Sequence, residues 1–147
     1  MRAGVDTNVW VSGALNPNGA PAEVRWALER GDFTLITNRP MLEELAEVLA
    51  RPRIADKYGI TPEDIAELVA LLAEKAEIVE VSGAMRLCRD PDDDVVLETA
   101  LNGQADVLVS RDEDLSRDLD LIALLEERGI RVLTVRRFLA ELESTHD

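Results

Sequence analysis

Short apolar runs alternate along the chain with longer segments whose apolar residues recur every three or four positions. Residues 2–6 and 107–110 are typical of buried strands, whereas Val24, Ala27 and Leu28 fall on one face of a helix. The pattern predicts strands at 2–6, 33–37, 77–81, 107–110 and 130–135, a helix or turn at 9–15, and helices at 21–30, 40–49, 62–75, 95–102, 119–128 and 137–142.

This alternation of strands and helices predicts a three-layer α/β/α fold, with a parallel sheet covered on both faces. Turn and cap residues mark several boundaries. The run Asn16-Pro17-Asn18-Gly19 breaks the chain after the first helix or turn, and Thr61 is well placed to cap the helix that begins at Pro62. Residues 90–94 are predicted to form an acidic loop leading into the helix at 95–102.

The length of 147 residues suits one domain with one core. The single cysteine, Cys88, cannot form an internal disulfide, and the N-terminus does not resemble a secretion signal. Charged residues interrupt every long apolar stretch, so we expect no membrane span. A cytoplasmic location follows as the expectation.

A net charge of −14 argues against a general polyanion-binding module, because nonspecific affinity for nucleic acids comes mainly from Lys and Arg. Acids gathered around divalent metals would reverse that argument, since bound cations draw phosphate into a negative pocket. The sole histidine, His146, lies one residue from the C-terminus. Histidine-based triads, Cys-His pairs and His-ligated zinc are therefore nearly excluded.

Acidic residues follow two of the predicted strands directly. Asp6 ends the first strand, and Asp112 and Asp114 come shortly after the strand at 107–110. Carboxyl ends of parallel strands meet at one edge of a sheet, where ligands bind. Taken singly, Asp6 is better explained as a helix cap and Asp112 as a turn residue, and it is their shared edge of the sheet that favours a site.

The helix at 40–49 carries three glutamates, which helical geometry separates. At about 100° per residue, Glu43 and Glu47 fall opposite the apolar stripe, while Glu44 lies on its flank and is expected to be half-buried. A half-buried glutamate is costly unless it is paired or binds a metal. The alternative for Glu44 is an ordinary position on the rim of the core.

The run Asp92-Asp93-Asp94 precedes the helix at 95–102. A favourable interaction with the helix dipole explains acids at this position. Projected backwards, Asp93 falls nearest the apolar stripe and Asp94 somewhat farther away. Helical geometry therefore favours Asp93 as the inward carboxylate, with Asp94 as the alternative.

A cluster of three or four carboxylates without histidine suits a hard divalent cation such as Mg²⁺. Such a site predicts phosphodiester hydrolysis, in which metals generate hydroxide and stabilise the attacking and leaving oxygens.

Four motifs in order then resemble one family: Asp6-Thr7-Asn8-Val9, the segment 41–49 with Glu44, the segment 90–94 before Leu97-Glu98-Thr99-Ala100, and the segment 109–115. The chain resembles PIN domains over about residues 2–135, with a C-terminal helix and tail at 136–147. More closely, it resembles the VapC-like toxins of bacterial toxin–antitoxin pairs.

The resemblance implies four or five parallel strands and an endoribonuclease dependent on Mg²⁺ or Mn²⁺. It implies dimers, or higher homo-oligomers, and leaves an antitoxin protein as a possible partner. The family's catalytic acids fall on Asp6, Glu44, Asp93 and Asp112, with Asp114 as a further metal ligand. The supporting positions fall on Thr7, Asn8 and Ser110, and Asp94 is an extra acid beside Asp93.

For RNA contacts we predict the arginines closest in sequence to these motifs, which are Arg39, Arg51, Arg53 and Arg111. Two alternatives remain: a structure-specific DNA nuclease, and a noncatalytic module whose acidic patch docks a basic segment. A phosphoaspartyl phosphatase would need an aspartate where Asn8 stands. A receiver domain would need a late lysine, and Lys57 and Lys75 are both too early.

Overall fold

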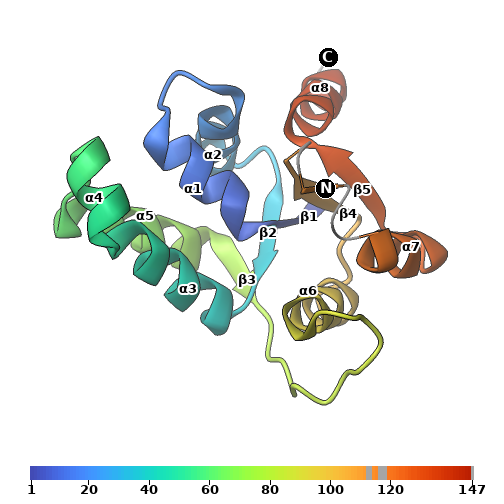
Figure 1. Cartoon of the computed structure of the whole chain (residues 1–147). Helices are drawn as coiled ribbons and strands as arrows, with labels where there is room; N and C mark the ends of the chain where they lie inside the picture. The colour runs from blue at the N-terminus through green and yellow to red at the C-terminus, as the bar shows by residue number, and fades with distance from the viewer. Residues whose placement is uncertain (112–113, 116–118, 147) are drawn as a thin grey trace.

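A five-stranded parallel sheet forms the centre of the computed structural model, which describes residues 1–111, 114–115 and 119–146 (Figure 1). The strand order is β3-β2-β1-β4-β5. The sheet confirms the predicted α/β class. Its strands are β1 (Arg2–Val5), β2 (Thr34–Thr37), β3 (Ala76–Ile78), β4 (Val107–Ser110) and β5 (Arg131–Thr134).

Helices cover both faces of this sheet, because alternate strand residues point to opposite sides. In β4, Val107 and Val109 belong to one buried cluster and Leu108 to another. The first cluster packs under α1 (Thr7–Leu15), α2 (Ala20–Arg30), α3 (Arg39–Ala50), α5 (Pro62–Lys75) and α8 (Val135–His146), and the second under α6 (Pro91–Asn102) and α7 (Leu119–Glu127) (Figure 1).

Several helices begin with a polar cap followed by proline. Thr61 and Asp64 form a capping box at the start of α5, with Pro62 between them. Helix α6 also begins with a polar cap followed by proline. The Asp90 side chain accepts a hydrogen bond from the Asp92 N–H, and Pro91 follows the cap. The prediction of an acidic loop at 90–94 was therefore wrong, because Asp92, Asp93 and Asp94 form the first turn of the helix.

Other boundaries differ from the predictions for equally local reasons. Arg51-Pro52 ends α3, as expected, but Pro52 also begins α4 (Pro52–Tyr58), a short helix that the pattern did not predict. Strand β3 is shorter than the predicted 77–81, and α8 begins two residues before the predicted 137. No helix among the described residues is long and apolar enough to cross a membrane.

Candidate active site

The strand order places a crevice beyond the carboxyl ends of β1 and β4. From β1 the chain proceeds outward to β2 and β3, and it later crosses to the other side of β1 to form β4 and β5. Ligands in open α/β sheets bind at such a reversal of strand order. A pocket of about 340 Å³ lies there, and its lining includes the carboxylates of Asp6, Glu44, Asp90, Asp92, Asp93 and Asp114.

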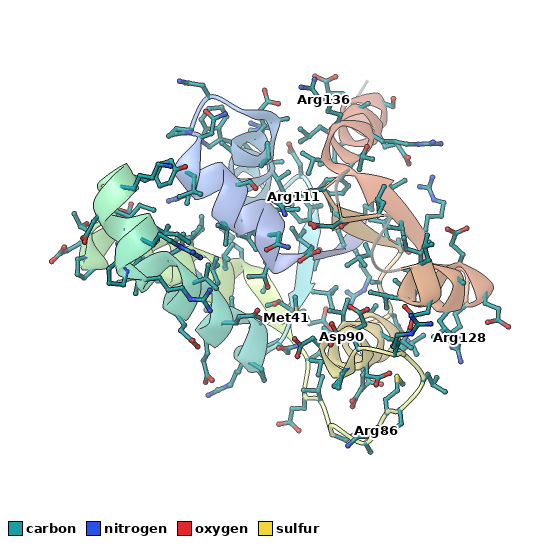
Figure 2. The ribbon with its side chains drawn as sticks, viewed as in Figure 1. Met41, Arg86, Asp90, Arg111, Arg128 and Arg136 are labelled. Carbon is teal, nitrogen blue, oxygen red and sulfur yellow. The ribbon has the colours of Figure 1, made fainter. Side chains whose placement is uncertain are left out.

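Segments far apart in the sequence form the walls of this pocket. Met41 on α3 and Asp90 at the start of α6 mark two walls, and both are labelled in Figure 2. Thr7, Asn8 and Ser110 also line the pocket. Of the residues proposed from sequence, Asp112 lies outside the described residues. The described acids Asp6, Glu44, Asp93 and Asp114 all reach the same pocket.

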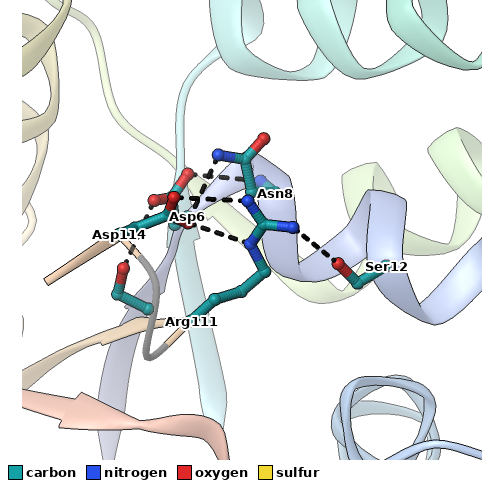
Figure 3. A network of polar contacts seen from close by, with 6 residues as sticks. Asp6, Asn8, Ser12, Arg111 and Asp114 are labelled. Carbon is teal, nitrogen blue, oxygen red and sulfur yellow. Dashed lines mark hydrogen bonds and ion pairs between the residues drawn. The ribbon is translucent and has the colours of Figure 1, made fainter. Parts of the chain in front are cut away.

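A polar network joins the ends of β1 and β4 (Figure 3). The Asp6 N–H donates to the Val109 carbonyl at 2.9 Å, which fixes the backbone of Asp6 beside β4. The Asp6 carboxylate caps α1 by accepting from the Asn8 N–H at 3.2 Å, and it also accepts from Ser110 Oγ at 3.4 Å. The cap interpretation of Asp6 is therefore correct in geometry, and the same side chain still lines the pocket.

Asp114 is almost fully buried, with 3% of its surface exposed, and both Arg111 and Asn8 donate to its carboxylate. Arg111 approaches it with two nitrogens, Nε at 3.0 Å from Oδ2 and Nη2 at 3.2 Å from Oδ1. The Asn8 side-chain amide donates to Oδ2 at 3.3 Å. This paired, charge-assisted geometry fixes the orientation of the Asp114 carboxylate.

A buried asparagine, which the sequence did not single out, helps to position α3, the helix that carries Glu44. Asn38 is fully buried and caps α3 by accepting from the Met41 N–H at 2.8 Å, while its amide donates to Thr99 Oγ1 on α6 at 2.6 Å. It thereby joins the helices that carry Glu44 and Asp93. Its position before Arg39-Pro40 is a cap signal that could have identified it.

Glu44 is exposed, so the expectation of a half-buried glutamate was wrong. The first turns of α3 line an open pocket, so Glu44 reaches the pocket without entering the core.

Asp93 and Asp94 are both buried, but their side chains have different surroundings. Asp93 lines the pocket. Asp94 Oδ1 accepts from the N–H groups of Leu87 and Cys88, at 2.8 and 2.7 Å. These hydrogen bonds hold the pKa of Asp94 below its usual value, with that from the Cys88 N–H contributing most. Asp94 therefore anchors the segment that precedes α6.

Two further carboxylates hold the same segment. Glu98, one turn after Asp94, accepts from the Ser82 N–H at 2.6 Å and the Gly83 N–H at 3.3 Å, and Asp120 accepts from the Arg89 N–H at 2.7 Å.

Burial, followed by the hydrogen bond to Asp94, raises the pKa of the Cys88 thiol to about 12. With this raised pKa, the Cys88 thiol is expected to be protonated at neutral pH.

The proposed RNA-binding arginines lie at different distances from the pocket. Arg111 contacts Asp114 directly, and Arg39 immediately precedes Pro40, which lines the pocket. Arg51 lies seven residues beyond Glu44, about 10 Å along the helix axis, and pairs with Glu47 on the surface. Arg53 is exposed on α4, which follows this far end of α3.

Comparison with known proteins identifies the family. The model of the PIN domain matches residues 2–114 of the 147, which includes the segments carrying Asp6, Glu44, Asp93 and Asp114. The chain belongs to the PIN-domain family. PIN domains are in general metal-dependent nucleases, so the acidic pocket is where nuclease chemistry is expected in this fold.

An uncharacterized protein of Methanocaldococcus jannaschii is similar to this PIN domain along most of its length. The two share 25% identity over 141 residues, which cover 95% of this chain and 90% of the relative. The similarity therefore extends into the C-terminal helix, beyond the segment that the family model matches. No solved structure matches the chain.

The chemistry of this PIN-domain pocket fits a hard divalent cation. Its described polar side chains are carboxylates, hydroxyls and an amide, which are oxygen donors of the kind that Mg²⁺ prefers. Among the described residues, no three acidic side chains lie close enough to hold one ion together. Mg²⁺ is commonly bound through one or two carboxylates and several waters, so the donor set does not require a preassembled cage.

Proposed function

We propose that this PIN domain is an endoribonuclease that hydrolyses RNA phosphodiester bonds with Mg²⁺ or Mn²⁺. The observation that carries the proposal is the convergence of Asp6, Glu44, Asp93 and Asp114 in one pocket at the switch point of the sheet. Acids from four segments of an acidic chain would repel one another at such a site. A function that uses cations gives this arrangement a physical reason.

One or two of the carboxylates of Asp6, Asp93 and Asp114 would hold the metal together with waters, with Glu44 at the open side and Asp112 as a further ligand. A bound ion of this kind lowers the pKa of its water and stabilises charge on the phosphate oxygens. The protein's own contribution is orientation. Ser110 and the Asn8 N–H hold the Asp6 carboxylate, while Arg111 and the Asn8 amide hold Asp114.

We further propose that the protein is the toxin of a toxin–antitoxin pair, acts in the cytoplasm and forms homodimers or higher homo-oligomers. The order and spacing of the four sequence motifs, which resemble those of VapC-like toxins, support this assignment. A cognate antitoxin would be a protein whose binding blocks access to the acidic pocket.

Incubation of wild type and Asp6→Asn with labelled single-stranded RNA, in Mn²⁺ or in chelator, tests the nuclease proposal. Cleavage is expected only for wild type with metal. Equal cleavage by both proteins would indicate a contaminating nuclease. A metal-independent acidic binding module would show no cleavage under any of these conditions.

A parallel panel of single-stranded, duplex and branched DNA tests the choice of substrate. A carboxylate site does not by itself distinguish ribose from deoxyribose. Preferential cleavage of branched DNA over RNA would replace the endoribonuclease with the structure-specific DNA nuclease.

A further inference from the structure

A second pocket, also about 340 Å³, lies where the connection between α1 and α2 meets the start of α8. Its polar lining comes from Ser12, Asn16, Arg111 and Arg136, with Gly19 in the wall. The described lining contains two arginines and no carboxylate. Because Arg111 is paired with Asp114, the positive charge that favours an anion here comes mainly from Arg136, in a chain whose net charge is −14.

Arg111 connects this second pocket to the acidic pocket. Its Nε and Nη2 bind Asp114, which lines the acidic pocket. Its Nη1 donates to Ser12 Oγ at 3.2 Å, and Ser12 lines the second pocket (Figure 3). One guanidinium therefore separates the two pockets. An anion in the second pocket would lie beside any phosphate positioned for cleavage.

Arg136 supplies the second positive charge. It is exposed at the second position of α8, and no carboxylate among the described residues forms an ion pair with it. The next residue, Arg137, differs in this respect, because its Nε lies 3.7 Å from Glu141 Oε2. Arg136 is thus positioned to contact a ligand, whereas Arg137 already interacts within its own helix.

Gly19 lies in the wall of the pocket, close to the Asn16 side chain. A Cβ at this position would lie 2.8 Å from the Asn16 side-chain nitrogen, although the φ of −88° is accessible to every residue. A larger residue at position 19 would therefore displace the Asn16 side chain, which lines the same pocket. The start of α2 beside Gly19 adds a partial positive charge to the same pocket.

We propose that this second pocket binds a backbone phosphate of the RNA substrate, adjacent to the phosphate that is cleaved. The assignment rests on the proposed nuclease function and extends it to a specific substrate contact. Guanidinium groups bind phosphate oxygens through paired hydrogen bonds. Arg136 contacts the flanking phosphate directly, and Arg111 fixes the spacing between this phosphate and the metal-binding carboxylates.

The test compares Arg136→Gln with Arg137→Gln, each of which removes one positive charge from neighbouring positions of α8. Both are made in the Asp6→Asn protein, so that bound RNA stays intact, and binding of fluorescein-labelled single-stranded RNA is measured by anisotropy across salt concentrations in Mn²⁺. Arg136→Gln should weaken binding about fivefold to tenfold and reduce the salt slope by about 0.7. Arg137→Gln should change neither.

Equal effects of the two substitutions, or no RNA binding by the Asp6→Asn protein, would overturn the phosphate pocket. In wild type, Arg136→Gln should raise KM and leave kcat unchanged. If RNA is cleaved but the two arginine variants behave alike, the pocket fails and the nuclease stands. If the anisotropy difference appears but wild type cuts no RNA, the nuclease proposal fails and the phosphate pocket stands.

Discussion

Asp93 and Asp94 are neighbours on α6, yet only one of them lines the acidic pocket. Successive helical residues differ by about 100° in direction, which turns the Asp94 carboxylate toward the N–H groups of Leu87 and Cys88. Projection from the apolar stripe already placed Asp93 closer to the interior. It could not show what Asp94 contacts, because that partner is an irregular segment without periodicity.

Asp93→Asn is predicted to leave the metal-free protein as stable as wild type, or slightly more stable. The substitution removes one of several like charges around the pocket and so relieves repulsion. The thermal stabilisation from added Mn²⁺ should shrink, because a metal ligand loses its charge. Melting curves with and without Mn²⁺ measure both effects. If Asp93 only stabilises the first turn of α6, asparagine at this position should preserve the full increase in melting temperature on addition of Mn²⁺.

The segment between β3 and α6 shows how one helix can order an irregular stretch of chain. Asp94 and Glu98 are one turn apart on α6, and both accept backbone hydrogen bonds from this segment. Charge-assisted bonds of this kind hold the pKa of Glu98 below its usual value, the Ser82 N–H contributing most. The carboxylate therefore stabilises the fold only while it is ionised.

This lowered pKa predicts the pH dependence of unfolding. A group whose folded pKa is depressed contributes stability above its unfolded pKa, and that contribution is lost as the pH falls through the folded value. Glu98→Gln should therefore be less stable than wild type above about pH 5, and the difference should vanish in stronger acid. Urea unfolding at neutral and acidic pH measures it, with exposed Glu43→Gln as the charge-matched control. A difference that persists unchanged in acid would contradict the role of the Glu98 charge.

Helix α8 is tied to the sheet by Phe138, which is fully buried and meets Phe33 edge-on with ring centroids 5.0 Å apart. Phe138→Ala should lower the free energy of unfolding by about 3–5 kcal/mol, because it leaves a cavity in the main cluster. Glu143→Ala, on an exposed part of the same helix, should change it by less than about 0.5 kcal/mol. Chemical denaturation of both variants provides the measurement, and equal small effects would show that α8 is not part of the cooperative core.

Element type was predictable where periodicity and caps agreed, as in β4 and α5. The start of α6 was missed although Asp90-Pro91 repeats the cap-and-proline order of Thr61-Pro62, because the acids obscured the helical pattern. Asn38 and Glu98 were missed for another reason. Their partners lie far away in the sequence, and only the folded chain brings Asn38 to Thr99 or Glu98 to Ser82.

At the scale of the whole molecule, we predict self-association. Trp26 on α2 is 48% exposed and lines a hollow that Leu139 and Leu142 on α8 also line. Sedimentation at micromolar concentration should show a species of about twice the chain mass of 16.2 kDa or more. A single species at the mass of one chain would remove the prediction.

The charge of the whole molecule is divided unevenly, with an acidic pocket and an arginine-lined pocket on either side of Arg111. This division suits a nuclease that binds cations in one place and phosphate in the other. We therefore expect cleavage to require carboxylates of the acidic pocket and not acids elsewhere on the surface.

The most direct test is the rate of Mn²⁺-dependent RNA cleavage by Asp93→Asn, compared with Glu43→Gln. Each substitution removes one negative charge, but only Asp93 lines the pocket, whereas Glu43 is exposed on α3. Loss of a residue that only hydrogen-bonds a metal ligand typically costs 10- to 100-fold in activity, so loss of a ligand should cost about 10²-fold or more. We expect the cleavage rate of Asp93→Asn to fall by this factor and that of Glu43→Gln to match wild type, whereas equal rates for all three proteins would show that the acidic pocket is not the site of cleavage.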